Sequence, residues 1–196
     1  MKQIYFATKN KGKVNSVGNI LSKYDIQVVH APLEMPEPRS DDLHEIAKEK
    51  VSFAFEKLKK PCIALDTGFY VHSLKGFPKA YVNFALETIG VEGILRLADG
   101  KPRECEFINC LAYLDENLKQ PLYFESTVAG TLSEAKRGRM SDKKEYSWSD
   151  LWLIFIPEGE NKTLAEISFG EYEKWREKRY VDSFATKFAE WFLKNN

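Results

Sequence analysis

The sequence predicts an α/β fold, and two features of the chain carry that prediction. Residues 4–8 are strand-like, a glycine-containing turn follows at residues 9–12, and a helix to about Lys23 leads into a second strand at residues 26–30. Further on, the unbroken apolar run at residues 62–65 is typical of a strand that is buried on both faces. The chain is therefore expected to build a sheet that opens with a β-α-β unit.

Prolines and capping residues mark where the next helix begins. Residues 31–39 contain three prolines and are not expected to form regular structure. Ser40-Asp41-Asp42 then supplies an N-cap, and apolar residues at helical spacing continue to about Lys59. The buried strand that follows ends at Leu65, directly before Asp66. An acid at the end of a buried strand indicates a place for chemistry.

The middle of the chain contains a further helix and two long strands. A turn at residues 76–78 leads into a helical pattern over residues 81–98. Extended segments at residues 104–114 and 122–132 follow, separated by the turn-rich residues 115–117. These two segments are expected to pair as antiparallel strands.

The last third of the chain is expected to hold a loop and a helix. Residues 134–145 are charged and predict an exposed loop. Residues 151–156 form an apolar run closed by Pro157, and a long helix is expected to end near Leu193. Because no internal repeat or low-complexity linker interrupts the sequence, we expect a single domain over residues 1–196.

Composition and charge exclude several classes of protein. With 43% hydrophobic and 30% charged residues, the sequence is an ordinary globular one rather than a disordered, collagenous or membrane sequence. Lys plus Arg and Asp plus Glu both number 29, so no net field draws the chain to nucleic acid or to an acidic membrane. The first residues run into the strand-like segment without an apolar signal region. We therefore expect a cytoplasmic protein that has neither nucleic acid nor a membrane as its partner.

The cysteines are expected to be buried and reduced. They are Cys62, Cys105 and Cys110, an odd number with no Cys-x-x-Cys spacing. This pattern disfavours both a disulfide framework and a zinc site. Cys105 and Cys110 are five residues apart in an extended segment, so their side chains are expected to point to opposite faces.

Histidines and a group of aromatic residues are also expected to be mainly structural. The histidines are scattered and predict structural or surface roles; they are His30, His44 and His72. Three aromatic residues could stack on a base, although core packing is expected for two of them; they are Tyr146, Trp148 and Trp152.

The turn after the first strand is a candidate anion site. Thr8-Lys9-Asn10-Lys11-Gly12-Lys13 lies between a strand and a helix, where backbone N–H groups and the positive helix end favour anionic oxygens. Three lysines add positive charge. Since the segment is neither a Walker loop nor a dinucleotide-binding fingerprint, a solvated turn is the alternative.

Two acids and a lysine could complete such a site. Glu45 and Lys50 are five residues apart on one predicted helix, and Asp66 follows the buried strand. If the fold brings them together, the carboxylates could hold a hard cation and the ammonium could hold a phosphate. The alternative for Glu45 is an exposed carboxylate on a helix.

The order of these segments resembles the Ham1/inosine triphosphatase family. Residues 8–13 match its T/S-x-N-x-x-K phosphate loop, residues 45–50 resemble its E-N-A-x-x-K helix, and residues 66–71 resemble its D-S-G-L-x-V segment. Gly76-Phe77-Pro78 with Tyr81 fits G-x-P-G-x-Y, and residues 154–166 resemble its I-F-x-P-E-G…K-T-x-A-E close. The similarity spans roughly residues 3 to 190.

This resemblance implies both a fold and an activity. The implied fold is an elongated mixed-sheet α/β structure of two lobes with an active-site cleft between them, usually in a homodimer. The implied enzyme is a pyrophosphatase that hydrolyses non-canonical purine nucleoside triphosphates, such as ITP, dITP and XTP, to the monophosphate and pyrophosphate. The implied cofactor is a divalent cation, Mg²⁺ or alternatively Mn²⁺.

The resemblance also implies roles for the matched residues. Thr8, Asn10, Lys13 and Lys50 would bind the phosphates of the substrate. Thr67, in place of a family serine, and Gly68 would complete the substrate-binding residues. Glu45 and Asp66 would hold the metal, and Asp66 would also activate the attacking water.

The chain departs from the family pattern at several positions. Leu65 replaces an acid before the catalytic aspartate, and Tyr180-Val181-Asp182 occupies the place of Ser-His-Arg near the C-terminus. These departures leave two alternatives open: a nucleotide-binding paralogue that has lost catalysis, and a pyrophosphatase with a different base specificity.

Overall fold

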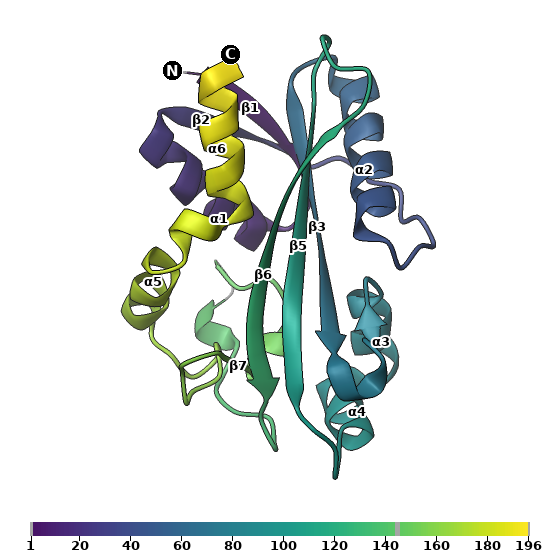
Figure 1. The fold of residues 1–196 in the computed structure, drawn as a ribbon, viewed down its shortest axis with the longest axis vertical. Coiled ribbons are helices and arrows are strands. Elements are labelled where there is room, and N and C mark those ends of the chain that lie inside the picture. Colours follow the sequence, from purple (N-terminus) through teal and green to yellow (C-terminus); the bar gives the residue numbers. More distant parts are fainter. Residues whose placement is uncertain (1, 144–145, 196) are drawn as a thin grey trace. The chain divides into compact units, whose positions relative to one another are not determined.

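The computed structural model describes residues 2–143 and 146–195, and it confirms the predicted β-α-β opening (Figure 1). Strand β1 (Lys2–Ala7) is followed by helix α1 (Lys11–Leu21), a 3₁₀ turn and strand β2 (Ile26–Ala31). The strands β1 and β2 are parallel and pair in register from Lys2 with Ile26 to Ala7 with Ala31. The turn after β1 therefore lies at the carboxyl end of a parallel strand pair.

The helix predicted after the proline-rich segment is α2 (Leu43–Leu58). Its N-cap is Asp42, whose side chain accepts a hydrogen bond from the His44 backbone N–H at 2.8 Å. The helix ends at Lys59, which is left-handed with φ of 49°. Both helix boundaries agree with those expected from the sequence.

The next strand, β3 (Cys62–Val71), is longer than predicted. The expectation that it ends at Leu65 was wrong, because the buried pattern continues through Phe69 and Val71. Its far end pairs antiparallel with the short strand β4 (Pro78–Lys79). Asp66 therefore lies inside the strand rather than after it.

The two long strands lie where they were predicted. They are β5 (Glu104–Leu114) and β6 (Leu122–Leu132), which are neighbours in the sheet, and β6 also pairs antiparallel with β7 (Phe155–Pro157). The apolar run at residues 151–156 thus forms a 3₁₀ turn and a short strand. The strand order is β2-β1-β3-β5-β6-β7, with β4 paired to β3.

Two segments that were each predicted as one continuous helix are each divided into two helices. The segment 81–98 forms α3 (Val82–Thr88) and α4 (Gly90–Leu97), because Gly90 has φ of +65° and interrupts the helix. The long C-terminal helix is likewise divided into α5 (Phe169–Glu177) and α6 (Phe184–Asn195). Ser183 ends the 3₁₀ turn between them and accepts a hydrogen bond from the Thr186 N–H, as a helix N-cap does.

The predicted exposed loop at 134–145 is described only up to residue 143. It holds a 3₁₀ turn at Ser141–Lys143, and the expectation of exposure was wrong for Lys143, which is buried. Its ammonium donates a hydrogen bond to the Ile167 carbonyl, which explains how the charge is tolerated there. None of the described helices is both long enough and apolar enough to cross a membrane.

The chain divides into two compact units. The first contains residues 1–67, 109–126 and 179–196, and the second contains residues 68–108 and 127–178. The prediction of a single domain, like that of a cleft between two lobes, stays a prediction. The predicted mixed α/β class is confirmed.

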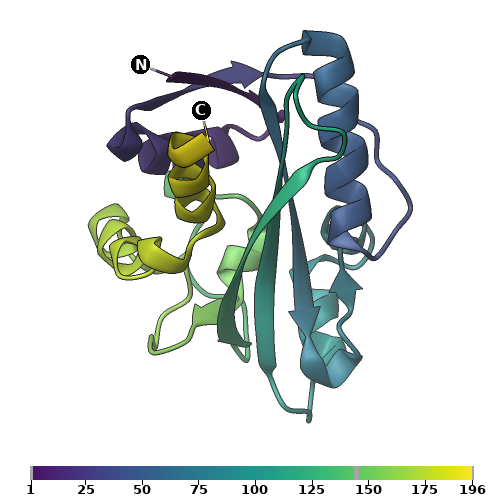
Figure 2. The same cartoon turned by 45° about the horizontal axis from the view of Figure 1, so that its top comes forward.

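Each unit has its own apolar core. In the first unit, α1 and α6 pack against each other (Figures 1 and 2), and Tyr113 of β5 packs against Phe188 and Phe192 of α6 at ring distances of 5.5 and 5.7 Å. In the second unit, Phe69 and Phe155 lie in one buried cluster with residues of α4. The three cysteines are buried and free, as predicted.

Candidate phosphate-binding site

The turn that connects β1 to α1 is held by its own polar side chains. Asn10 is the N-cap of α1, and its side-chain oxygen accepts a hydrogen bond from the Lys13 backbone N–H at 3.0 Å. The Thr8 hydroxyl accepts one from the Asn10 N–H at 3.1 Å, and the Thr8 carbonyl lies 2.8 Å from His30 Nε2. This turn therefore presents the positive end of an eleven-residue helix with no acid in its first turn.

Strand β3 brings Asp66 to the level of this turn. Tyr5 and Phe6 of β1 pair with Cys62 and Ile63 of β3, and no later pair joins these strands in the described residues. Because β1 turns into the loop after Ala7, β3 continues beyond its neighbour. Asp66 lies on this continuation.

Asp66 is buried and is held in an ion pair with Lys50 of α2. The Lys50 Nζ lies 2.7 Å from Asp66 Oδ1 and 3.5 Å from Glu37 Oε2. Burial alone would lower the pKa of Lys50, but the two carboxylates outweigh it and the pKa is raised. Lys50 is therefore a permanently charged ammonium at neutral pH, and the fold confirms that it lies beside Asp66.

Lys13 is the second cation of the site. Its Nζ donates a hydrogen bond to the Leu65 carbonyl at 3.2 Å, next to Asp66 in the strand. Burial lowers the pKa of Lys13 to about 8, with the Lys50 charge acting in the same direction and Asp66 and Glu37 opposing it. An added anion would favour the charged form of this ammonium. Together Lys13, Lys50 and Asp66 form what we call the lysine–aspartate cluster.

Thr67 extends the site along β3 and reveals a residue that was missed. Its hydroxyl donates a hydrogen bond to Asn109 Oδ1 of β5 at 3.1 Å, and Asn109 Nδ2 donates to the Ser126 carbonyl at 3.5 Å. Asn109 is buried. The signal that could have identified it is a single amide inside the otherwise apolar stretch of residues 108–112.

Glu45 is the predicted residue that does not join the cluster. It lies in the first turn of α2, is exposed, and accepts a hydrogen bond from the Ser40 hydroxyl at 2.7 Å. The acid that reaches Lys50 is instead Glu37, from the proline-rich segment. Glu37 could not be predicted from the sequence, because three nearby prolines excluded regular structure but did not place its carboxylate.

Gly68 belongs to the second unit and has a packing explanation. A Cβ atom at this position would lie 2.6 Å from Cε2 of Tyr70. In the same unit, Trp152 is buried in the core with Tyr146 packed on it at 5.8 Å between ring centroids. Of the aromatic residues Tyr146, Trp148 and Trp152, two were expected to pack in the core, and Tyr146 and Trp152 do so.

The arrangement in the first unit suits an anion with several negative charges. Two ammonium groups and the amino end of α1 can neutralise phosphate oxygens, and lysines act as point charges toward them. A buried carboxylate beside them can accept a proton or ligate a cation. This combination of groups suits the binding of a phosphoanhydride.

Comparison with known proteins agrees with these observations. The Ham1 family model matches residues 4–179. A dITP/XTP pyrophosphatase of Methanopyrus kandleri is 36% identical, with 99% of this chain and 97% of the relative covered. A protein of the same name from Saccharolobus solfataricus is 35% identical, with 93% of this chain and 90% of the relative covered.

Solved structures give the same fold. The Ham1 protein of Staphylococcus aureus superposes with a TM-score of 0.73 at 24% identity and covers 98% of both chains. A Ham1 protein from Coxiella burnetii superposes with a TM-score of 0.76 at 19% identity over 100% of both. From the matched length and the similarity of its relatives, the chain belongs to the Ham1 family.

Proposed function

We propose that this protein hydrolyses non-canonical purine nucleoside triphosphates of the ITP, dITP and XTP class to a nucleoside monophosphate and pyrophosphate. Relatives that match it over nearly their whole length carry the name dITP/XTP pyrophosphatase. In the reaction, water attacks the α-phosphorus and the bond to the oxygen bridging the α- and β-phosphorus breaks. The leaving group is pyrophosphate.

The observation that carries this proposal is the lysine–aspartate cluster. Lys50 lies 2.7 Å from the buried Asp66, and Lys13 is bonded to the Leu65 carbonyl next to it. The two ammonium groups lie close enough to the same carboxylate for its charge to act on both of them. A triphosphate would replace the carboxylates as the partner of these ammonium groups.

Each residue has a defined task in the proposed reaction. Lys13, with Thr8 and Asn10 on the same turn, holds the leaving pyrophosphate at the amino end of α1. Lys50 neutralises charge on the reacting phosphate and leaves Asp66 available to accept a hydrogen bond from water. Thr67, held by Asn109, fixes the direction of the strand beside Asp66.

The residues also fit a divalent cation. Asp66 and Glu45 offer carboxylate oxygens, the hard ligands that Mg²⁺ and Mn²⁺ prefer. When bound there, such an ion offsets charge on the phosphates and lowers the pKa of a water molecule. In this structure the exposed Glu45 carboxylate accepts a hydrogen bond from the Ser40 hydroxyl, so holding the ion together with Asp66 would require Glu45 to turn away from Ser40.

Two further features belong to the proposal: assembly as a homodimer and a cytoplasmic location. The large exposed apolar residues of the second unit support a contact between copies, notably Phe84 at 65% exposure, with Ile89 and Leu97. Light scattering of the purified chain tests the dimer, with Phe84→Ser as the variant expected to weaken it.

Leu65 favours the alternative of a nucleotide-binding paralogue without catalysis. Its side chain is buried and apolar at the position where the family pattern has an acid. If that loss abolishes hydrolysis, the chain is a nucleotide-binding paralogue without catalysis. If hydrolysis persists on other bases, the specificity differs from that of its relatives.

The experiment is pyrophosphate release from a panel of triphosphates. The panel contains ITP, dITP, XTP, the four standard ribonucleotides and modified pyrimidines, each with Mg²⁺, with Mn²⁺ and with a chelator. The proposal predicts metal-dependent release that is fastest for the three non-canonical purines. Equal rates for all bases would overturn the specificity, and binding without turnover on every base would establish the paralogue.

A further inference from the structure

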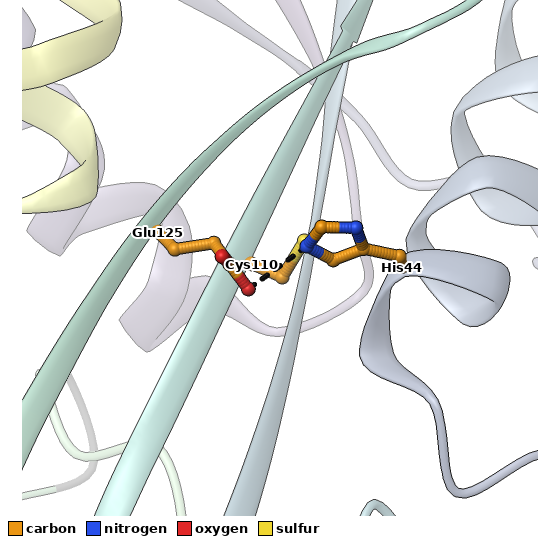
Figure 3. A group of neighbouring side chains, drawn as sticks. All are labelled: His44, Cys110 and Glu125. Carbon is orange, nitrogen blue, oxygen red and sulfur yellow. Dashed lines mark ion pairs between the residues drawn. The ribbon is translucent and has the colours of Figure 1, made fainter.

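Three side chains with metal-binding atoms meet in the first unit, outside the lysine–aspartate cluster. They are His44 of α2, Cys110 of β5 and Glu125 of β6, and their ligand atoms all lie within 4.8 Å of one another (Figure 3). We propose that this histidine–cysteine cluster is a second metal site, built for a borderline-soft divalent ion such as Zn²⁺. Neither the family resemblance nor the proposed hydrolysis assigns these residues a role.

The histidine is already oriented for such a role. Its ring stacks on Tyr123 of β6, with centroids 4.5 Å apart and planes 8° from parallel. Its Nε2 lies 2.9 Å from Glu125 Oε1, and each of the two side chains is about half exposed, at 47% and 48%. The stacking holds the imidazole while leaving the carboxylate free to move.

The cysteine supplies the ligand that selects the ion. Cys110 is fully buried, and burial, with the charges of Glu125, Asp66 and Asp42, raises the pKa of its thiol to about 12. The thiol therefore keeps its proton while no cation is near. When Zn²⁺ binds, a sulfur–zinc bond forms and the thiol proton passes to solvent, so that binding releases one proton from this residue.

The spacing requires only a small adjustment. Zinc bonds of about 2.0–2.3 Å at tetrahedral angles place ligand atoms roughly 3.3–3.6 Å apart. The half-exposed Glu125 carboxylate would move outward from its 2.9 Å contact with His44 to admit the ion. Three protein ligands and a water molecule then complete four-coordination, which is the pattern of a zinc site with one open position.

This ligand set is chemically distinct from the carboxylates proposed for Mg²⁺. Thiolate and imidazole favour Zn²⁺ over Mg²⁺, whereas Asp66 and Glu45 offer only oxygen. A large excess of Mg²⁺ should therefore leave the second site available. The competing explanation is an ordinary surface His–Glu ion pair that happens to cover a buried thiol.

The chain contains a matched control for that explanation. His72 pairs with Glu106 at 3.3 Å, with one partner again half exposed, but none of the described cysteines joins them in a metal-binding group. A second control is Cys62, which is buried and free elsewhere in the first unit. The three ligand variants are His44→Asn, Cys110→Ala and Glu125→Gln.

The full chain is titrated with Co²⁺ and with Zn²⁺ in excess Mg²⁺. We expect one Co²⁺ per chain with a thiolate-to-cobalt charge-transfer band, displacement by Zn²⁺, and proton release seen by calorimetry in two buffers. Each ligand variant should lose roughly tenfold or more in affinity. Cys110→Ala should also abolish the band, while His72→Asn, Cys62→Ala and Asp66→Asn should retain it.

The outcomes separate the possibilities. Absence of the band in the parent chain, or its persistence in Cys110→Ala, overturns the proposal. Co²⁺ binding that shows no thiolate band and is lost in Asp66→Asn would place the ion at the other site and also overturns the proposal. If Cys110→Ala fails to fold, as circular dichroism would show, the half-exposed variants His44→Asn and Glu125→Gln decide through their zinc affinities, and unchanged affinities reject the site.

Discussion

The lysine–aspartate and histidine–cysteine clusters each contain a carboxylate but differ in the groups around it and in their exposure. The first has two ammonium groups around a buried carboxylate, with its Lys50 and Asp66 side chains only 13% and 11% exposed. The second has an imidazole and a carboxylate that are about half exposed above a buried thiol. The first cluster therefore suits polyanions, and the second suits a borderline-soft divalent cation.

The comparison shows how one helix can serve both clusters. His44 and Lys50 lie on the same helix, α2, six residues apart, and each contacts a different part of the sheet. Six residues correspond to about 600° of helical rotation, which is about 120° short of two full turns. The two side chains therefore leave the helix in directions that differ by about 120°. A single element thus separates a cation site from an anion site without any loop insertion.

The largest effect is expected from Asp66→Asn, which removes the negative charge of Asp66 and keeps the size of its side chain. If Asp66 orients the attacking water and ligates the metal, turnover should fall by at least roughly 10²-fold. Substrate affinity should fall much less, since both lysines remain. Initial rates of pyrophosphate release from dITP measure the first quantity, and binding of a nonhydrolysable analogue measures the second. Unchanged turnover would remove Asp66 from the reaction.

The next effect concerns the contribution of the buried Lys50–Asp66 ion pair to the stability of the fold. Lys50→Met leaves Asp66 buried without its 2.7 Å partner, which should lower the free energy of unfolding by about 3 kcal/mol at neutral pH. Denaturant unfolding of Lys50→Met, of Asp66→Asn and of the double variant measures this loss. The double variant should recover part of the loss, and strictly additive losses would contradict a coupled pair.

Lys13→Ala tests the phosphate contact without breaking that ion pair. A charge-assisted contact worth about 1.5–3 kcal/mol corresponds to a loss of triphosphate affinity of roughly ten- to hundredfold. Nucleoside affinity should hardly change. Calorimetric titration with an analogue and with the free nucleoside compares the two, and equal affinities of variant and parent would remove the assignment.

The pH dependence of binding should follow Lys13. Its pKa is lowered to about 8, so the ammonium loses its proton as the pH rises through 8 and the attraction for phosphate is lost with it. Affinity for a nonhydrolysable triphosphate should fall about tenfold between pH 7 and pH 9. Lys13→Arg keeps its charge over this range and serves as the control, which should bind with little pH dependence. A parent chain whose affinity is flat between pH 7 and pH 9 would contradict the assignment.

The smallest effect is expected at the second cluster in the absence of its ion. His44→Asn removes a half-exposed pair with Glu125, and such pairs contribute about 0–1 kcal/mol to stability. Turnover of dITP with Mg²⁺ should be unchanged. A large loss of turnover would show that the two clusters are coupled through α2.

The two clusters also differ in how far the sequence could predict them. Lys13, Lys50 and Asp66 lie in short segments whose order resembles a family, and the β-α-β opening predicted the turn that leads into the helix carrying Lys13. Cys110 gave no such signal, because its two partners, His44 and Glu125, come from two other segments of the chain. Ligand spacing along a chain identifies a metal site only when the ligands are neighbours in sequence.

The remaining errors have local physical causes. The strand β3 was cut short at Leu65 because an acid was read as a strand end, whereas the Lys50 ammonium satisfies Asp66 inside the strand. The last helix was predicted as continuous because Ser183 was not recognised as an N-cap. Asn109 was missed because a buried amide needs a partner from another strand, which the sequence does not specify.

The most direct test of the proposed hydrolysis is to identify the products formed from dITP with Mg²⁺. If Lys13 holds a pyrophosphate leaving group at the amino end of α1, as proposed, the bond that breaks lies between the α- and β-phosphates. The predicted result is equal amounts of dIMP and pyrophosphate, resolved by chromatography and phosphorus NMR. Formation of dIDP and inorganic phosphate, or binding of dITP with no product in the presence of either Mg²⁺ or Mn²⁺, would contradict it.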